Sequence, residues 1–248
     1  MIRYHGGPVT PLSACVSLWT ARHAFVSFAR PDQIAVAADV CQSFALDNGA
    51  FSFWKAGQGE IDIGAYAEFV QEWQLHPAFD WCVIPDSVDG DHNDNARLRA
   101  AWYARGMRGG VPVYHLHEPL EVLRDLAHSY DRVALGSSGE YAQPETPRWW
   151  ARMAEMMSVV CDEEGRPRTR LHGLRMLAPT IFSHVPLASA DSTNAAQNVG
   201  LDTRWVGPYQ PMTKDARAIV MRDRVEAHAA AARWCGSAGV QRNMEIIG

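Results

Sequence analysis

The 248-residue sequence lacks the features that mark disulfide-rich, zinc-binding and membrane proteins. Its five cysteines are scattered and form no Cys-x-x-Cys pair, so neither a zinc knuckle nor a disulfide framework is indicated. Reduced, mostly buried thiols are expected, as in a cytosolic protein. The first residues contain no signal-peptide core, and no apolar run approaches the length of a membrane span. The sequence therefore predicts a cytoplasmic protein with no membrane partner.

An excess of positive charge is also missing. The net charge is -5 and the pI is about 6.0, so no global basic field indicates a nucleic-acid partner. A local basic rim remains compatible with these values, because an average over the chain hides it. No low-complexity run and no internal repeat interrupts the chain.

What the sequence does contain is a series of short apolar runs that end in polar or small residues. Eight runs are typical of β-strands, and a helix-sized segment follows each: residues 2–4, 23–28, 43–46, 81–84, 111–114, 132–135, 170–174 and 187–190. Strands that alternate with helices indicate a parallel sheet, and eight in this length predict an α/β protein with a (β/α)₈ TIM-type barrel over residues 1–199. Residues 200–248 are expected to form a C-terminal loop and helical extension packed on the barrel, with a long helix from about 214 to 234.

Polar side chains follow the carboxyl ends of these strands, where the active sites of such barrels lie. One strand runs into Asp47 and then an Asn48-Gly49 pair that can take positive φ, and a distant strand runs into Asp191. We expect the two carboxylates to face each other across one site. The other strand ends contribute further candidates for substrate contact: Asp86, His115, His117, Gly136, Ser137 and His172.

Two chemistries suit such a set, and the residues leave both open. His115 and His117 lie two apart on one strand, so with the aspartates they suit a metal-dependent hydrolase. Paired carboxylates instead suit glycosidic-bond cleavage, in which one acts at the anomeric carbon and the other moves a proton. Phe51, Phe53 and Trp54 near the rim would stack on a nucleobase, or fill space between a loop and its helix.

Five motifs also lie on the strands in the order found in a known family. They are Asp47-Asn48-Gly49-Ala50-Phe51, the segment from Asp80 to Asp86, Ala134-Leu135-Gly136-Ser137-Ser138, Leu171-His172-Gly173-Leu174, and Ser189-Ala190-Asp191-Ser192-Thr193. On these motifs the chain resembles, over roughly residues 1–200, the tRNA-guanine transglycosylase superfamily, and within it the shorter DpdA-like proteins that act on bases in DNA.

The resemblance implies a role for each matched residue. Asp191 would be the nucleophile or charge stabiliser at C1′, and Asp47 the general acid/base. Asp86 would accept hydrogen bonds from the base, and Gly136 with Ser137 would offer backbone contacts. Asn48, Phe51, His115, His117 and His172 complete the expected substrate-binding set, and no metal or other cofactor is expected.

The departures from the family shape the functional expectation. The family's zinc site after the barrel is missing, since only Cys235 lies there, which favours DNA over tRNA as the partner. The sequence thus predicts a DNA glycosylase that removes a modified base and leaves an abasic site, with a role in defence against phages that carry modified DNA. The alternatives are exchange of the base for a 7-deazaguanine, a metal-dependent hydrolase, and a non-catalytic nucleic-acid-binding barrel.

The partner also needs cationic contacts along its backbone. Arginines flank the strand at residues 170–174, and one more follows the predicted barrel. They are expected to bind phosphates. The set comprises Arg166, Arg168, Arg170, Arg175 and Arg204.

Overall fold

The computed structural model describes residues 1–200 and 211–236, and its eight strands form one all-parallel sheet. The strands lie in the order β4-β3-β2-β1-β8-β7-β6-β5. They are β1 (Ile2–Gly6), β2 (His23–Ser27), β3 (Ser43–Asp47), β4 (Phe79–Cys82), β5 (Val113–His115), β6 (Arg132–Gly136), β7 (Arg170–Gly173) and β8 (Ser189–Ser192). The predicted α/β class and the eight parallel strands are confirmed.

The sheet is curled so far that its two edges meet at one point. Val83, just after β4, forms an isolated parallel bridge with Val111, just before β5. The Val111 N–H donates to the carbonyl of Cys82 over 2.8 Å, and the Ile84 N–H donates to the carbonyl of Val111 over 2.9 Å.

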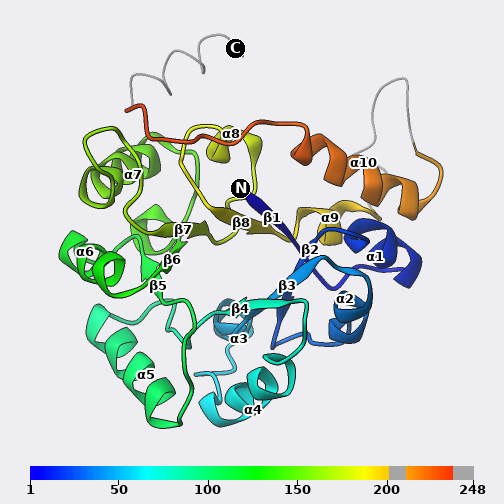
Figure 1. Cartoon of the computed structure of the whole chain (residues 1–248), viewed down its shortest axis with the longest axis horizontal. Coiled ribbons are helices and arrows are strands. Elements are labelled where there is room, and N and C mark those ends of the chain that lie inside the picture. Colours follow the sequence, from blue (N-terminus) through cyan, green and yellow to red (C-terminus); the bar gives the residue numbers. More distant parts are fainter. Residues whose placement is uncertain (201–210, 237–248) are drawn as a thin grey trace.

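Helices lie around the outside of the curled sheet (Figure 1). They are α1 (Leu12–Trp19), α2 (Ile34–Val40), α3 (Ala50–Lys55), α4 (Ile63–Trp73), α5 (His92–Ala104), α6 (Leu120–Ser129), a 3₁₀ turn η1 (Gly139–Tyr141), α7 (Pro147–Val160), α8 (Pro179–Phe182), α9 (Asn194–Asn198) and α10 (Lys214–Glu226). No described helix is long and apolar enough to cross a membrane. All five cysteines are free thiols.

Alternate strand residues face the helices and the interior, because successive side chains of a strand point to opposite faces. On β6, Val133 and Leu135 join the apolar cluster under the helices, whereas Ala134 joins the interior cluster. The same interior cluster contains Tyr4 and Trp81. Both faces are therefore buried, which explains why the strands read as nearly continuous apolar runs.

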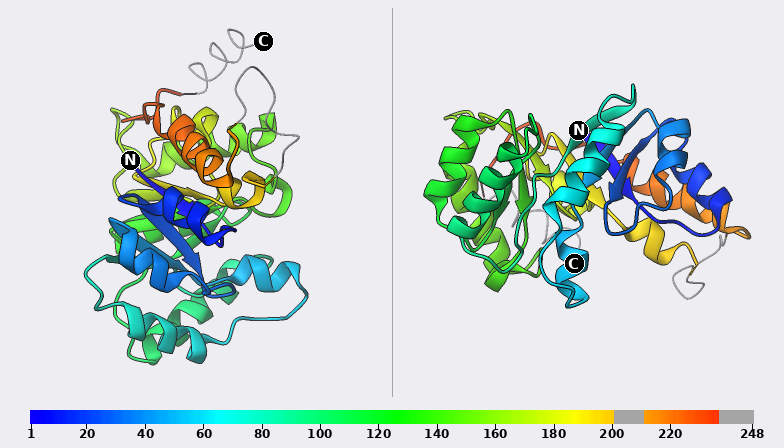
Figure 2. Two further views of the ribbon diagram at one scale, coloured as in Figure 1. Left: turned by 90° about the vertical axis from the view of Figure 1, so that its right-hand side faces the viewer. Right: turned by 90° about the horizontal axis from the view of Figure 1, so that it is seen from below.

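The C-terminal helix α10 packs against α1, as Figures 1 and 2 show from three directions. It ends at Glu226, so the predicted long helix to residue 234 is wrong in its second half. The chain beyond it is held by tertiary hydrogen bonds: the Ala231 N–H donates to the carbonyl of Phe182, and the Trp234 N–H to that of Gly165. These contacts override the helix propensity of the alanine-rich tail.

Candidate active site

The floor of the candidate site is the last inward-facing layer of the sheet. Phe25 and Ala45 belong to the interior cluster, and two residues further along their strands stand Ser27 and Asp47. The same step of two leads from Val113 to His115 and from Ala134 to Gly136. On β8 it leads from Ser189 to Asp191. Because every second side chain of a strand faces inward, these groups all lie inside the sheet at one of its ends.

Above this floor lies a cavity of about 550 Å³, within the usual size range of small-molecule sites. Most of the predicted site residues line it, and the list is Asp47, Asn48, Phe51, Asp86, His115, Gly136, Ser137, Arg175 and Asp191. The structure therefore brings the two predicted catalytic aspartates into one cavity, as expected from the strand ends.

Asp47 is half-buried at the end of β3 and lines the cavity. Burial raises the pKa of its carboxyl to about 7, and the negative charges of Asp191 and Asp86 add to the rise. A contact from Ser27 and the Gly49 N–H, 3.2 Å from Oδ2, act in the opposite direction. Asp47 is thus a carboxylic acid that holds its proton up to neutral pH.

Asp191 stands in a different environment at the end of β8. Its Oδ1 accepts the backbone N–H of Arg175 over 2.8 Å and lies 3.4 Å from Nε2 of His172. Burial lowers the pKa of His172, and this effect outweighs the opposing one of Asp191. The Arg175 N–H thus orients Asp191 beside an imidazole whose pKa is lowered.

The turn that delivers Asp47 depends on Asn48 and Gly49. Gly49 has a φ of 81°, and a Cβ there would come within 2.9 Å of Ala29, so only glycine fits without strain. The Asn48 side chain is buried and donates to the carbonyl of Ile84 and to Asp86 Oδ1, while it accepts the Ala50 N–H. The predicted positive φ is confirmed, and Asn48 holds two loops together.

Asp86 is engaged by protein on both oxygens. Oδ1 accepts from Asn48 Nδ2 over 2.6 Å, and Oδ2 lies 2.9 Å from Nε2 of His115. Burial lowers the pKa of His115, but the hydrogen bond and charge of Asp86, with the charge of Glu118, outweigh it and leave the pKa raised. Asp86 nevertheless lines the cavity and each of its oxygens can accept a second hydrogen bond, so its role towards a base stays a prediction. His115 Nδ1, buried and without a partner, is the free polar group here.

A buried carboxylate of the loop after β5 supports His115. Glu118 is 2 % exposed; its Oε2 accepts the His115 N–H, and its Oε1 accepts Nδ2 of Asn95. Asn95 in turn accepts the N–H of Ser87, next to Asp86. One network thus fixes both members of the Asp86–His115 pair.

Two predicted substrate-binding histidines lie away from the cavity. His117 places Nδ1 2.8 Å from Ser138 Oγ and Nε2 3.2 Å from the carbonyl of Gly90. His172 is fully buried in the sheet interior, with Nδ1 2.8 Å from Ser189 Oγ. Neither lines the cavity: His117 joins two loops, and His172 lies beneath Asp191, so their contact with substrate stays a prediction.

His115 and His117 are not arranged as a pair of metal ligands. His115 bonds to Asp86, whereas His117 bonds to Ser138. Within residues 1–200 and 211–236, no three His, Cys, Asp or Glu side chains are placed to hold a metal ion.

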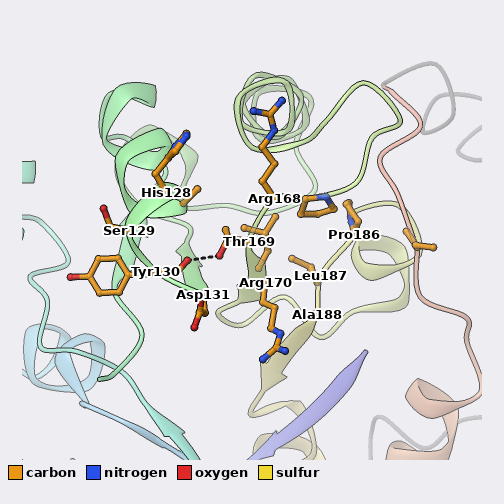
Figure 3. Close-up of a pocket in the computed structure, with 15 residues that line it drawn as sticks. His128, Ser129, Tyr130, Asp131, Arg168, Thr169, Arg170, Pro186, Leu187 and Ala188 are labelled. Atoms are coloured by element: carbon orange, nitrogen blue, oxygen red, sulfur yellow. Dashed lines mark hydrogen bonds between the residues drawn. The ribbon is translucent and has the colours of Figure 1, made fainter. Parts of the chain in front are cut away.

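The predicted basic patch is divided between the two ends of β7. Arg168 and Arg170 precede or begin the strand and line a separate hollow of about 750 Å³ at the amino ends of β7 and β8, where their side chains point away from each other (Figure 3). Arg166 lies earlier in the same connection, bonded through its N–H to Asp162. Only Arg175 reaches the aspartate cavity, and Arg204 lies outside the described residues. The four arginines therefore do not form the single patch that their spacing predicts.

Sequence reasoning also missed two cations at the cavity mouth. Arg30 follows β2 and Lys55 ends α3, and both line the cavity. Only their positions relative to strand ends could have indicated them.

The chain matches no family model, no curated protein and no solved structure. Its likeness to the transglycosylase superfamily therefore stays a prediction from motifs. The evidence on function comes from its own side chains, chiefly the two aspartates of the cavity floor.

Proposed function

We propose that the chain cleaves the N-glycosidic bond of a nucleobase in DNA with Asp47 and Asp191. The observation that carries this proposal is the contrast between two carboxyl groups in one cavity, one protonated up to about pH 7 and the other placed among hydrogen-bond donors. Neighbouring acids whose environments differ in this way divide the roles of acid and base between them.

The reaction then proceeds in two steps. Asp47 gives its proton to the leaving nitrogen of the base while the bond to C1′ breaks, and the Asp191 carboxylate stabilises the positive charge at C1′ or bonds to it. Water next adds to C1′, displacing the Asp191 carboxylate where it has bonded there, and returns a proton to Asp47, which leaves an abasic site. If a second base adds instead, the same residues perform base exchange, and we favour hydrolysis.

The rest of the cavity suits a base that has left its helix. Phe51 provides an aromatic face, and Gly136 packs closely on the buried imidazole of His115, since a Cβ there would lie 3.3 Å from Nδ1. Asp86, whose oxygens also hold Asn48 and His115, keeps its proposed role as the group that contacts the base. We also propose that the strands close into a full (β/α)₈ barrel, which the Val83–Val111 bridge supports. Cytoplasmic location and a role in phage defence stay predictions.

Incubation with unmodified and hypermodified phage DNAs tests the proposal. Released base is measured by mass spectrometry, and abasic sites by strand scission in alkali. We expect release from at least one DNA, lowered about 100-fold or more in Asp47→Asn and in Asp191→Asn, because loss of a general acid has effects of that order.

Asp125→Asn is the matched control, because this exposed carboxylate of α6 lies outside the cavity. It should release base at the wild-type rate. Uptake of a labelled 7-deazaguanine without scission would show base exchange. Release that survives both cavity variants would overturn the proposed roles, and no turnover of any DNA would overturn the function.

A further inference from the structure

The mouth of the cavity carries a second set of residues that the proposed chemistry does not use. We name Arg30, Phe51, Trp54, Lys55 and Arg175 the α3 rim, since three of them belong to α3 and the others follow β2 and β7. All but Trp54 line the cavity. All five side chains are exposed, and the two aromatic ones are exposed to 38 % and 48 %.

Three of these side chains form a row that leads outward from the reacting groups. The guanidinium carbon of Arg175 lies 4.3 Å from the centre of the Phe51 ring, and the Phe51 ring lies 5.7 Å from that of Trp54. Arg175 has a φ of 60° and donates its N–H to Asp191. The row therefore begins at a catalytic aspartate and ends at the surface.

The cations of the rim are available to a ligand. Within residues 1–200 and 211–236, neither Lys55 nor Arg175 forms an ion pair with a carboxylate. Arg30 lies 3.2 Å from Asp32, but both side chains are 63 % exposed, so this pair holds weakly. Asp89 accepts the Trp54 indole N–H over 3.1 Å.

The cations of the rim oppose the negative charge of the cavity. Asp86 and Asp191 line the cavity beside the protonated Asp47, and the chain carries a net charge of -5, so a polyanion approaching the floor is repelled. Cations at the mouth oppose this repulsion where phosphates would pass. Exposed aromatic rings beside such cations are the arrangement that binds unpaired bases along a backbone.

We propose that the α3 rim binds the DNA strand on either side of the target nucleotide. Lys55, Arg30 and Arg175 hold flanking phosphates, and an unpaired neighbouring base stacks on Phe51 and Trp54. This inference rests on the proposed function and specifies its substrate: a nucleotide within a single-stranded or locally unpaired strand, rather than a free nucleoside. It replaces the arginines before β7 as the backbone-binding surface.

Fluorescence anisotropy with a labelled single-stranded DNA tests the rim, using Asp47→Asn protein so that the strand is not consumed. Lys55→Gln and Arg175→Gln should each weaken binding about 3- to 10-fold at low salt. Each should also lower the slope of log affinity against log salt by about 0.7, the value for one phosphate contact on a single strand. Trp54→Ala should weaken binding about 5-fold or more, from lost stacking.

Two further variants should not weaken DNA binding: one should tighten it and the other should leave it unchanged. Asp32→Asn frees Arg30 from its partner and should tighten binding about 2-fold. Arg168→Gln makes the same charge change as Arg175→Gln at the opposite end of β7, so it should leave both affinity and salt slope unchanged. Thermal melting followed by circular dichroism confirms that each variant is folded.

The results separate this inference from the proposed function. Equal losses in Arg168→Gln and Lys55→Gln, or DNA binding that no rim variant weakens, would overturn the rim and leave base release standing. Failure of the protein with an unaltered rim to bind DNA, or its tighter binding of an RNA of the same sequence, would also overturn the inference. Binding through the rim without base release from any DNA would instead support the rim and contradict the glycosidic reaction.

Discussion

The raised pKa of Asp47 lowers the free energy of unfolding at high pH, and this effect can be measured. Its folded-state pKa is about 7 against an ordinary 3.8, so the folded chain binds more protons than the unfolded chain between about pH 4 and pH 7. The contribution of Asp47 is therefore most favourable below pH 4 and becomes unfavourable as the pH rises through 7. Asp47→Asn should stabilise the protein by about 1–3 kcal/mol at pH 8 and have little effect at pH 4, measured by urea unfolding.

Asn is the suitable replacement because its oxygen can still accept the Gly49 N–H. Asp125→Asn, at an exposed position, should show no such pH dependence. An equal change in the free energy of unfolding at both pH values would mean that the carboxyl is not held protonated.

Asp86 links the titrations of two cavity groups. It raises the pKa of Asp47 through its charge, and it raises that of His115 through a hydrogen bond and its charge. Asp86→Asn should therefore move both pKa values down. We expect the high-pH decline of base release to begin at lower pH, and the His115 ring to lose its proton at lower pH in an NMR titration.

His117 provides the internal reference for that titration. Its ring is 5.8 Å from that of His115, yet it bonds to Ser138 and Gly90. Its signals should move much less than those of His115. Equal shifts of both rings would indicate a general structural change and contradict a direct Asp86–His115 link.

Single residues show where sequence reasoning succeeds. A strand that ends in a carboxylate followed by Asn-Gly predicted Asp47 and the positive φ of Gly49, because both follow from local rules. Burial of Glu118 and the use of both Asp86 oxygens depend on neighbours more than 20 residues away, Asn95 and Asn48, and local patterns do not contain that information.

At the level of elements, strand existence was predictable and strand position less so. The strands β4, β5 and β8 begin two residues away from the predicted starts, at Phe79, Val113 and Ser189. An apolar run that is buried on both faces has no alternation to fix its ends. The same limit explains the divided arginines, since Arg170 and Arg175 are close in sequence but Arg170 begins a strand and Arg175 follows it.

The short helices α3, α8 and α9 were not predicted, and α10 was predicted too long. Helices of four to six residues show too few turns for a periodic pattern. In the tail after α10, backbone bonds to Phe182 and Gly165 compete successfully with alanine's helix propensity.

The end of α10 is fixed by one carboxylate whose contribution can be measured. Glu226 lies 2.7 Å from Arg22 Nε and 3.3 Å from His5 Nε2. Burial raises the pKa of Glu226, but these two partners outweigh it and hold the pKa below its ordinary 4.5. The stabilisation is therefore present above that value and is lost as the pH falls through the folded-state pKa.

Glu226→Gln should lower the free energy of unfolding by about 1 kcal/mol at pH 7, and the difference should vanish in acid. Glu155→Gln is the comparison, since Glu155 pairs with Arg152 over a similar 2.8 Å but is 55 % exposed. Its effect should be near zero. A larger effect at Glu155 than at Glu226 would show that the contacts of Glu226 with Arg22 and His5 do not stabilise the end of α10.

At the scale of the whole molecule, side chains in the interior of the sheet both stabilise the fold and support the candidate site. Trp81 of β4 lies 5.8 Å from Tyr4 of β1 and 4.7 Å from His172 of β7, measured between ring centres. The guanidinium of Arg132 on β6 lies over the Trp81 ring at 5.1 Å, and the Trp81 indole N–H donates to the Tyr4 hydroxyl. One side chain thus contacts strands from both halves of the sheet, directly beneath the residue that adjoins Asp191.

Trp81→Ala should therefore weaken the fold and the reaction together. Removal of a buried tryptophan costs about 3–5 kcal/mol, which circular dichroism in urea would measure. Base release by the fraction that stays folded should also fall, because His172 loses the ring that fixes it beside Asp191. Trp54→Ala removes the same side chain from the exposed rim and should leave the urea midpoint unchanged while it weakens DNA binding. If the two variants unfold at the same urea concentration, the interior cluster is not what joins the halves of the sheet.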